Sequence, residues 1–234
     1  MIAAVVNALA VLAGSLLGLL LRTRLKDGYR NVVYGGAGLV SLAIGISMSL
    51  QSGKIVYLAL SIIFGGILGE WWKIEDGVLH LGEFLKRHFA KGEDGKGFAY
   101  AFLDSSVLFC VGAMALVGSF KAGTEGNYDL IFTKSVMDGF MAVVLTAAMG
   151  IGVAFSSLTI LVYQGALTLL SQWVKPLVSD LMLKEISGTG GLLVIAIGIN
   201  LLGMAKIKTA NFLPALLLIA AFIALDGLLF AAPA

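Results

Sequence analysis

Seven long windows of this chain carry no charged residue, and they constrain its fold more than any other feature. A charged group at the centre of a bilayer costs about 3 kcal/mol even on lenient insertion scales. Hydrophobic residues make up 59% of the sequence and charged residues only 13%, so no polar face remains to cover a soluble fold. The chain is therefore expected to span a membrane, through windows 1–21, 31–53, 55–69, 105–120, 139–174, 186–205 and 209–225.

The fifth window is too long for a single span. Its 36 residues would form a helix of about 54 Å, against a hydrocarbon core of about 30 Å. A turn is expected at Gly150, Gly152, Ser156 and Ser157. The prediction is an all-α bundle forming one transmembrane domain over 1–234, with about eight helices near 2–21, 32–51, 55–72, 102–120, 134–154, 157–174, 187–205 and 210–230.

Lys and Arg residues divide unevenly between alternate connections of these helices. Eleven lie on one side (Arg22, Arg24, Lys26, Arg30, Lys73, Lys86, Arg87, Lys91, Lys96, Lys206 and Lys208) and five on the other (Lys54, Lys121, Lys134, Lys175 and Lys184). Cytoplasmic loops collect basic residues. This predicts a multi-pass protein with both termini outside.

Residues 73–101 are the most polar stretch of the chain. Apolar residues at helical spacing alternate there with charged ones, and Trp71 and Trp72 precede them at a position typical of the headgroup region. The pattern predicts an amphipathic helix and loop on the cytoplasmic interface of the membrane.

A short sequence repeats within the chain. GLVSLAIGI at 38–46 matches GLLVIAIGI at 191–199 at six of nine positions, with Gly38 aligned to Gly191 and Gly45 to Gly198. The two copies fall on helices that cross in opposite directions, so the repeat is inverted, with helices 1–3 and 6–8 as halves and helices 4 and 5 between them. Inverted repeats are typical of transporters, although a duplication without moving parts would leave the same trace.

Polar residues inside the spans are the candidate ion ligands, because each needs a partner or a function in lipid. Asp138 lies near the outer end of its helix, and pairing with Lys134 four residues earlier is an equally ordinary role for it. Ser47 and Asn200 occupy equivalent positions of the repeat and are predicted to face each other. The proposed substrate or ion-binding set is Asp138, Gln164, Asn200, Ser47, Asn7 and Asp104.

Two of these features have simpler structural explanations. Asp104 precedes Ser105 and Ser106 at the predicted start of a helix, where an N-cap is the plain interpretation. Glycine-rich segments open the second and seventh predicted helices, and unwound helix starts bind anions, although glycines also allow close helix packing. The alternative anion site comprises Gly35, Gly36, Gly38, Gly188, Thr189, Gly190 and Gly191.

The sequence gives little support for catalysis, and the protein is not expected to be an enzyme. It contains no nucleotide-binding loop, zinc-protease motif or nucleophile elbow, and its single cysteine, Cys110, excludes an intramolecular disulfide and a cysteine metal motif. No cofactor and no metal centre are predicted, and the basic loops need no nucleic-acid partner.

Three blocks of the sequence resemble a known family. FCVGAMALVGSF at 109–120, KSVMDGFMAVVLTAAMGIGVAFS from Lys134 and LVYQGALTLL from Leu161 are similar to the YqgA/YdfK family of uncharacterised bacterial inner-membrane proteins. The resemblance implies a location in the bacterial inner membrane and a possible sodium channel or pump.

The leading hypothesis is a transporter or channel for a small ion, in particular a monovalent cation such as sodium, with Asp138, Gln164 and Asn200 as oxygen ligands. One alternative is a carrier of small organic or inorganic anions. Another, of a different class, is a membrane scaffold whose interfacial helix binds a partner or lipid. The glycine-rich helix faces also suit a homodimer.

Overall fold

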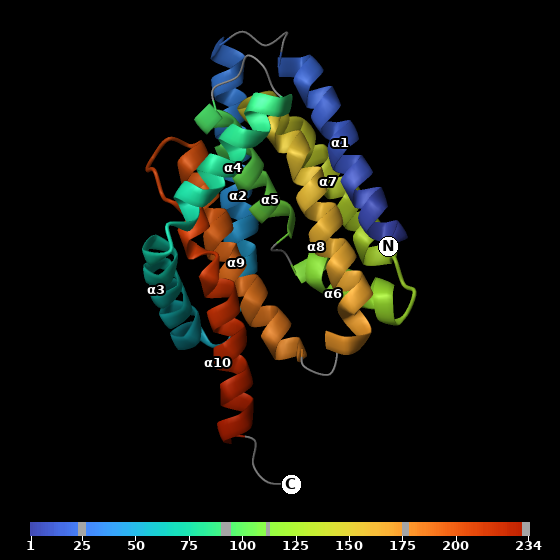
Figure 1. Cartoon of the computed structure of the whole chain (residues 1–234), viewed down its shortest axis with the longest axis vertical. Helices are drawn as coiled ribbons and strands as arrows, with labels where there is room; N and C mark the ends of the chain where they lie inside the picture. Colours follow the sequence, from blue (N-terminus) through green and yellow to red (C-terminus); the bar gives the residue numbers. More distant parts are fainter. Residues whose placement is uncertain (23–26, 90–94, 111–112, 175–177, 231–234) are drawn as a thin grey trace.

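The computed structural model is a bundle of helices (Figure 1). It describes residues 1–22, 27–89, 95–110, 113–174 and 178–230, and every regular element among these residues is helical. Six helices are long and apolar enough to cross a membrane, or up to eight spans if each of two bent helix pairs counts as one. The elements are α1 (Ile2–Arg22), α2 (Asp27–Ser49), α3 (Ile55–Trp71), α4 (Ile74–Phe89), α5 (Gly95–Cys110), α6 (Ala113–Thr124), α7 (Asp129–Met149), α8 (Gly152–Val174), α9 (Asp180–Leu201), the short 3-10 helix η2 (Thr209–Phe212) and α10 (Pro214–Phe230).

The fold confirms the all-α polytopic bundle and corrects several boundaries. The predicted turn in the long fifth window occurs at Gly150, whose φ of 100° suits glycine and ends α7. The predicted single helix at 102–120 is instead two helices, α5 and α6, whose axes differ by 58°. Helix α4 follows α3 after a 55° bend, with Lys73 at a φ of 54° between them.

Helices α2 and α9 pack antiparallel along the repeated sequence. A Cβ on Gly45 would lie 2.7 Å from the carbonyl oxygen of Gly191, and one on Gly198 would lie 2.9 Å from that of Gly38. The first glycine of each copy therefore meets the last glycine of the other, as an in-plane two-fold axis between the helices requires. The other equivalent pairs, α3 with α10 and α1 with α8, are also in contact, so the packing fits the predicted inverted repeat.

Ion pairs close both ends of the α3–α10 pair in the same way. At the start of α3, the Lys54 ammonium lies 3.0 Å from Asp226, and the Tyr57 hydroxyl donates to the same carboxylate at 2.6 Å. The hydrogen bond and charge of Asp226 raise the pKa of Lys54 above its ordinary value.

At the start of α10, Lys208 bonds Glu70 at 2.9 Å and the Asn211 amide donates to it at 2.6 Å. The hydrogen bond to Glu70 and the negative charge of that carboxylate raise the pKa of Lys208 above its ordinary value. In both ion pairs a lysine and a hydrogen-bond donor three residues later bind a carboxylate near the end of the partner helix. This similarity is further support for the two-fold relation between α3 and α10.

Glu185, on α9, ties the two halves together although it was not among the predicted functional residues. Its side chain is fully buried and accepts from the Ser52 hydroxyl at 2.5 Å and from the backbone N–H groups of Gly53 and Lys54 at 2.7 and 3.1 Å. The carboxylate thereby satisfies backbone donors in the turn before α3.

Replacing Glu185 by alanine is expected to destabilise the protein by about 2–4 kcal/mol, because it leaves buried backbone donors without an acceptor. Lys184→Ala is the matched control, since its side chain is the exposed neighbour on the same helix. Thermal unfolding in detergent measures both variants. Equal melting temperatures for the two would show that Glu185 does not hold this turn.

The outer surface of the bundle is apolar. Large hydrophobic side chains are exposed on several helices, with Val136 at 75%, Leu217 at 74% and Trp173 at 81% of their full accessibility. Exposure of this extent suits contact with lipid rather than with water.

Candidate functional site

The bundle has two ends, which we name by the predicted orientation. The inner side carries the α1–α2, α7–α8 and α9–α10 connections, and the outer side carries α2–α3, α6–α7 and α8–α9. Figure 1 shows the end of α1 and the start of α2 at the top, and the end of α8 and the start of α9 toward the bottom. A cavity lies toward each side, and we call them the inner and the outer cavity.

The outer cavity contains a buried ion pair. It has a volume of about 210 Å³ and is lined by Ile44, Met48, Gln51, Leu108, Phe109, Met114, Lys134, Met137, Asp138, Met141 and Ser187. The Lys134 ammonium is hydrogen-bonded to the Asp138 carboxylate one turn away on α7. Lys134 is 5% exposed and Asp138 is 7% exposed. The Lys134 ammonium lies 6.0 Å from the centre of the Phe109 ring. A pair so far from water persists only because each charge holds the other.

Asn7 joins this pair to Gln164. Its side-chain amide donates to Asp138 at 3.0 Å and to Gln164 at 3.1 Å. Both amides are fully buried, and the Asn7 oxygen and the Gln164 nitrogen have no hydrogen-bond partner. Three of the predicted site residues therefore meet, and they present an unused acceptor and an unused donor inside the protein.

Glycines on α1 bring Asn7 to this position. A Cβ on Gly14 would lie 2.1 Å from the carbonyl oxygen of Gly139, and one on Gly18 would lie 2.4 Å from that of Val143. Only glycine allows α1 to approach α7 so closely. Because Asn7 lies two helical turns before Gly14 on the same helix, this contact places its amide against Asp138.

The inner cavity is larger and more polar. Its volume is about 430 Å³, and its lining residues are Tyr34, Glu75, Tyr100, Asp104, Met149, Asn200, Leu201, Ala205, Lys206, Ile207 and Lys208. Asp104 is buried and accepts a hydrogen bond from Thr209 at 3.2 Å. The predicted N-cap role of Asp104 is wrong, because α5 begins at Gly95 and places Asp104 well inside the helix.

The two cavities are lined by equivalent positions of the repeat. The alignment that pairs Gly38 with Gly191 also pairs Tyr34 with Ser187 and Met48 with Leu201. Tyr34 and Leu201 line the inner cavity, whereas Ser187 and Met48 line the outer one. The two-fold relation between α2 and α9 thus exchanges the two cavities as well as the two helices.

Closely packed side chains separate the cavities. Ala37, Leu145 and Ile197 are almost completely buried and belong to one hydrophobic core cluster. They lie on α2, α7 and α9 between the positions that line the inner cavity and those that line the outer one. Along α7, Met141 and Met149 mark the two cavities, about 12 Å apart at 1.5 Å per residue.

Asn200 and Ser47 do not face each other, and this prediction is corrected. Packing of Gly45 on Gly191 places Ser47 at the outer end of the helix pair and Asn200 at the inner end. An in-plane two-fold axis brings together only equivalent residues that lie near the axis. Ser47 is exposed. The Asn200 amide donates to the carbonyl of Ile207 and accepts from its N–H, both at 2.8 Å.

Asn200→Ala is expected to destabilise the protein by about 1–2 kcal/mol without changing ion selectivity, because the Asn200 side chain closes the 201–208 loop. Asn31→Ala, at an exposed position of α2, is the control. Melting temperature and reversal potential measured on the same preparations separate stability from selectivity. A change in selectivity would return Asn200 to the set of ion ligands.

The glycine segments do not begin helices. Ser179 is the N-cap of α9, so Gly188, Thr189, Gly190 and Gly191 lie two or more turns inside it, and α2 begins at Asp27, before Gly35. The charged residues before each glycine segment continue the helix beyond the uncharged window. The predicted anion site at unwound helix starts therefore loses its structural basis, and Gly38 and Gly191 instead serve close packing.

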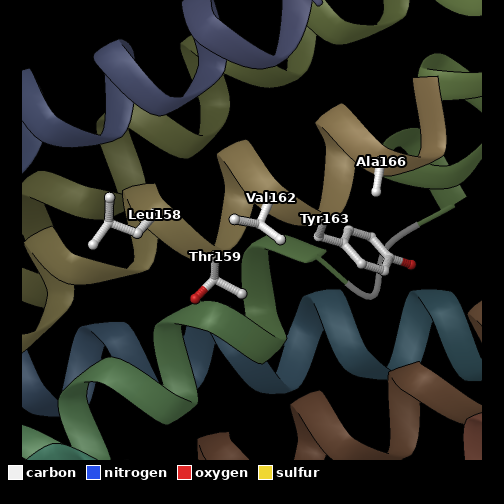
Figure 2. Close-up of a pocket in the computed structure, with 5 residues that line it drawn as sticks. All are labelled: Leu158, Thr159, Val162, Tyr163 and Ala166. Atoms are coloured by element: carbon white, nitrogen blue, oxygen red, sulfur yellow. The ribbon is translucent and has the colours of Figure 1, made fainter. Parts of the chain in front are cut away.

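A third hollow is an apolar groove on α8. Figure 2 shows its five lining residues, Leu158, Thr159, Val162, Tyr163 and Ala166, and the groove has a volume of about 500 Å³. Leu158 and Val162 are exposed, and the Thr159 hydroxyl pairs with Ser106 on α5 at 3.1 Å. Such a lining suits lipid chains, because these five described residues include no charged one and their only polar side-chain groups are the hydroxyls of Thr159 and Tyr163.

Two buried carboxylates were missed by the sequence analysis. Glu75 lies in the stretch 73–101 that was predicted as an interfacial helix and loop, yet its side chain is 2% exposed and lines the inner cavity. Glu185 lies just outside an uncharged window. No sequence signal distinguishes a buried carboxylate from a solvated one at the end of a span, because burial depends on which backbone donors the fold brings to it.

The fold and the apolar surface define a multi-pass α-helical membrane protein, and the comparisons with known proteins agree. The chain belongs to the family described as "Protein of unknown function (DUF554)", whose model matches residues 2–224. It is 32% identical over 216 residues to the uncharacterised protein YqgA of Escherichia coli (strain K12), covering 91% of this chain and 92% of the relative. It is 29% identical over 222 residues to the uncharacterised membrane protein YdfK of Bacillus subtilis (strain 168), covering 93% of both. No solved structure matches.

Proposed function

We propose that this protein transports a small monovalent cation across the bacterial inner membrane. The observation that carries the proposal is the pair of cavities, one toward each side, lined by equivalent positions of an inverted repeat. In transporters built this way, exchanging the conformations of the two halves opens one cavity and closes the other. The buried barrier of Ala37, Leu145 and Ile197 would prevent leakage in between.

Asp138 is the proposed ion ligand in the outer cavity. The group that it holds, the Lys134 ammonium, is itself a monovalent cation. The site is therefore suited to one positive charge beside one carboxylate. The unpaired oxygen of Asn7 and the side-chain oxygen of Gln164 lie next to it as further neutral ligands. A transported cation would compete with Lys134 for this carboxylate.

Ion flux in sealed proteoliposomes tests the proposal. Purified protein is expected to carry sodium or another monovalent cation above the rate of empty vesicles, and Asp138→Asn is expected to remove the difference. Asp129→Asn, at an exposed position at the start of the same helix, should leave flux intact. Absence of monovalent cation flux from folded protein would reject the proposal.

The anion carrier and the membrane scaffold predict other outcomes of the same experiment. An anion carrier would move anions and be insensitive to Asp138→Asn. A scaffold would move nothing and would depend on α4 for partner or lipid binding. The predicted absence of enzymatic activity, the external termini and the homodimer are further proposals. Thiol labelling from the two sides of the membrane tests the orientation.

A further inference from the structure

Among the residues that the structure describes, two buried carboxylates and no buried cationic side chain line the inner cavity. Asp104 is 4% exposed and Glu75 is 2% exposed, and both line the cavity. The cavity's only lysines among the described residues, Lys206 and Lys208, are exposed. Lys208 is already bonded to Glu70. Buried carboxylates are stable when a cation accompanies them. Within the described ranges, Asp104 and Glu75 have no buried lysine bonded to them, whereas Asp138 in the outer cavity is bonded to Lys134.

Glu75 has an unused oxygen in this cavity. One carboxylate oxygen accepts from the backbone N–H of Ala210 at 3.0 Å, whereas Oε1 is buried without a hydrogen bond. The Tyr100 hydroxyl also interacts with the Glu75 carboxylate, yet Oε1 is without a hydrogen-bond partner in the part of the chain that the structure describes. A buried acceptor of this kind is available to a donor group of a ligand.

The size and the aromatic lining favour an organic cation over a bare metal ion. A volume of about 430 Å³ falls within the range of about 300–1,000 Å³ typical of small-molecule sites. Tyr34 and Tyr100 add aromatic rings to the lining, and aromatic faces attract ammonium groups.

The outer cavity also combines a buried carboxylate with an aromatic ring, and there a lysine of the protein supplies the cation. There the protein's own alkylammonium, Lys134, is held by a carboxylate with the Phe109 ring 6.0 Å away. The inner cavity, which is its equivalent in the repeat, offers buried carboxylates and aromatic rings, and its two lysines, Lys206 and Lys208, are exposed.

We propose that the inner cavity binds a small primary alkylammonium ion, held by the carboxylates of Asp104 and Glu75 and packed against Tyr34 and Tyr100. The proposal rests on the proposed cation transport and names the chemical class of its substrate. Its ammonium would donate to Glu75 Oε1 and to Asp104, and its short alkyl chain would contact the rings.

Binding of n-butylammonium, which reproduces the lysine side chain, tests the proposal. Purified full-length protein in detergent is titrated with n-butylammonium chloride, with sodium chloride at equal ionic strength as the reference, and the melting temperature is followed. A saturable rise of about 2–5 °C beyond the sodium reference is expected. Asp104→Asn and Glu75→Gln should each raise the dissociation constant about tenfold or more, because each loses a charge-assisted hydrogen bond.

Two further variants separate this site from its surroundings. Tyr100→Leu should weaken binding about threefold or more while Tyr100→Phe retains it, because the ring rather than the hydroxyl contacts the cation. Asp129→Asn, at an exposed position at the start of α7, should leave the dissociation constant unchanged. Binding that is lost with Asp138→Asn and kept with Asp104→Asn would overturn the assignment to the inner cavity.

A protection experiment keeps the test decisive if the carboxylate variants fold poorly. Ala205→Cys places a thiol on the cavity lining, and n-butylammonium should slow its modification by a maleimide whereas sodium should not. Equal modification rates, or a melting temperature that follows ionic strength alone, would overturn the proposal. Flux of monovalent cations, sodium and n-butylammonium included, measured on the same protein in proteoliposomes reports on transport independently of binding to the inner cavity, so failure of the two ideas can be distinguished.

Discussion

Asp138→Asn is expected to abolish cation flux and to destabilise the protein by about 3–5 kcal/mol. The substitution leaves the Lys134 ammonium buried without its counter-charge, and breaking a buried ion pair from one side has a cost of this size. Flux in proteoliposomes and thermal unfolding in detergent measure the two effects. Asp129→Asn is the matched control, because it removes a carboxylate from an exposed position of the same helix.

The double variant Asp138→Asn with Lys134→Met separates transport from stability. It removes both charges and leaves an uncharged pair of similar volume, so most of the lost stability should return. Flux should not return, since the carboxylate is still missing. Recovery of both properties would show that the ion pair is structural and that the path of the cation avoids it.

Alanine at both Gly45 and Gly191 is expected to have the second large effect. Each added methyl group would lie within 2.7 Å of the other glycine's carbonyl oxygen. The helices α2 and α9 must separate to accommodate them, at a cost of about 1–3 kcal/mol for each overpacked position. The yield of folded protein and its melting temperature in detergent measure the result.

Gly36→Ala is the control for these glycine variants, because a Cβ at Gly36 meets nothing within 4 Å. It should be neutral or slightly stabilising, since alanine favours a helix more than glycine does. If the double variant were as stable as Gly36→Ala, α2 and α9 would not pack through their repeated glycines and the two-fold relation would lose its main contact.

Uncharged windows predicted most of the fold, because the cost of a charge in lipid is local and additive along the chain. They located the spans and the turn at Gly150. They failed at helix ends, where residues before Gly188 and before Gly35 continue the helix into the polar region. They also failed at the break between α5 and α6, where no proline or charge interrupts the window at 105–120.

The candidate site was predictable only in part. Burial of polar residues in lipid selected Asp138, Asn7 and Gln164, which the structure brings together. The antiparallel register separated Ser47 from Asn200. A single sequence shows which positions of the two repeats are equivalent. It does not specify which of these positions lie near the two-fold axis and therefore meet. The role of Glu75 depends on how α4 packs against α5 and η2, which amphipathic spacing does not specify.

Thiol accessibility from the two sides of the membrane tests the central claim, that equivalent cavities open to opposite sides. Ser187→Cys lines the outer cavity and Met149→Cys the inner one, each in a Cys110→Ala background that removes the chain's only cysteine. In right-side-out and inverted vesicles, an impermeant maleimide is expected to modify Ser187→Cys only from the outside and Met149→Cys only from the cytoplasmic side. Modification of both positions from the same side would contradict the account.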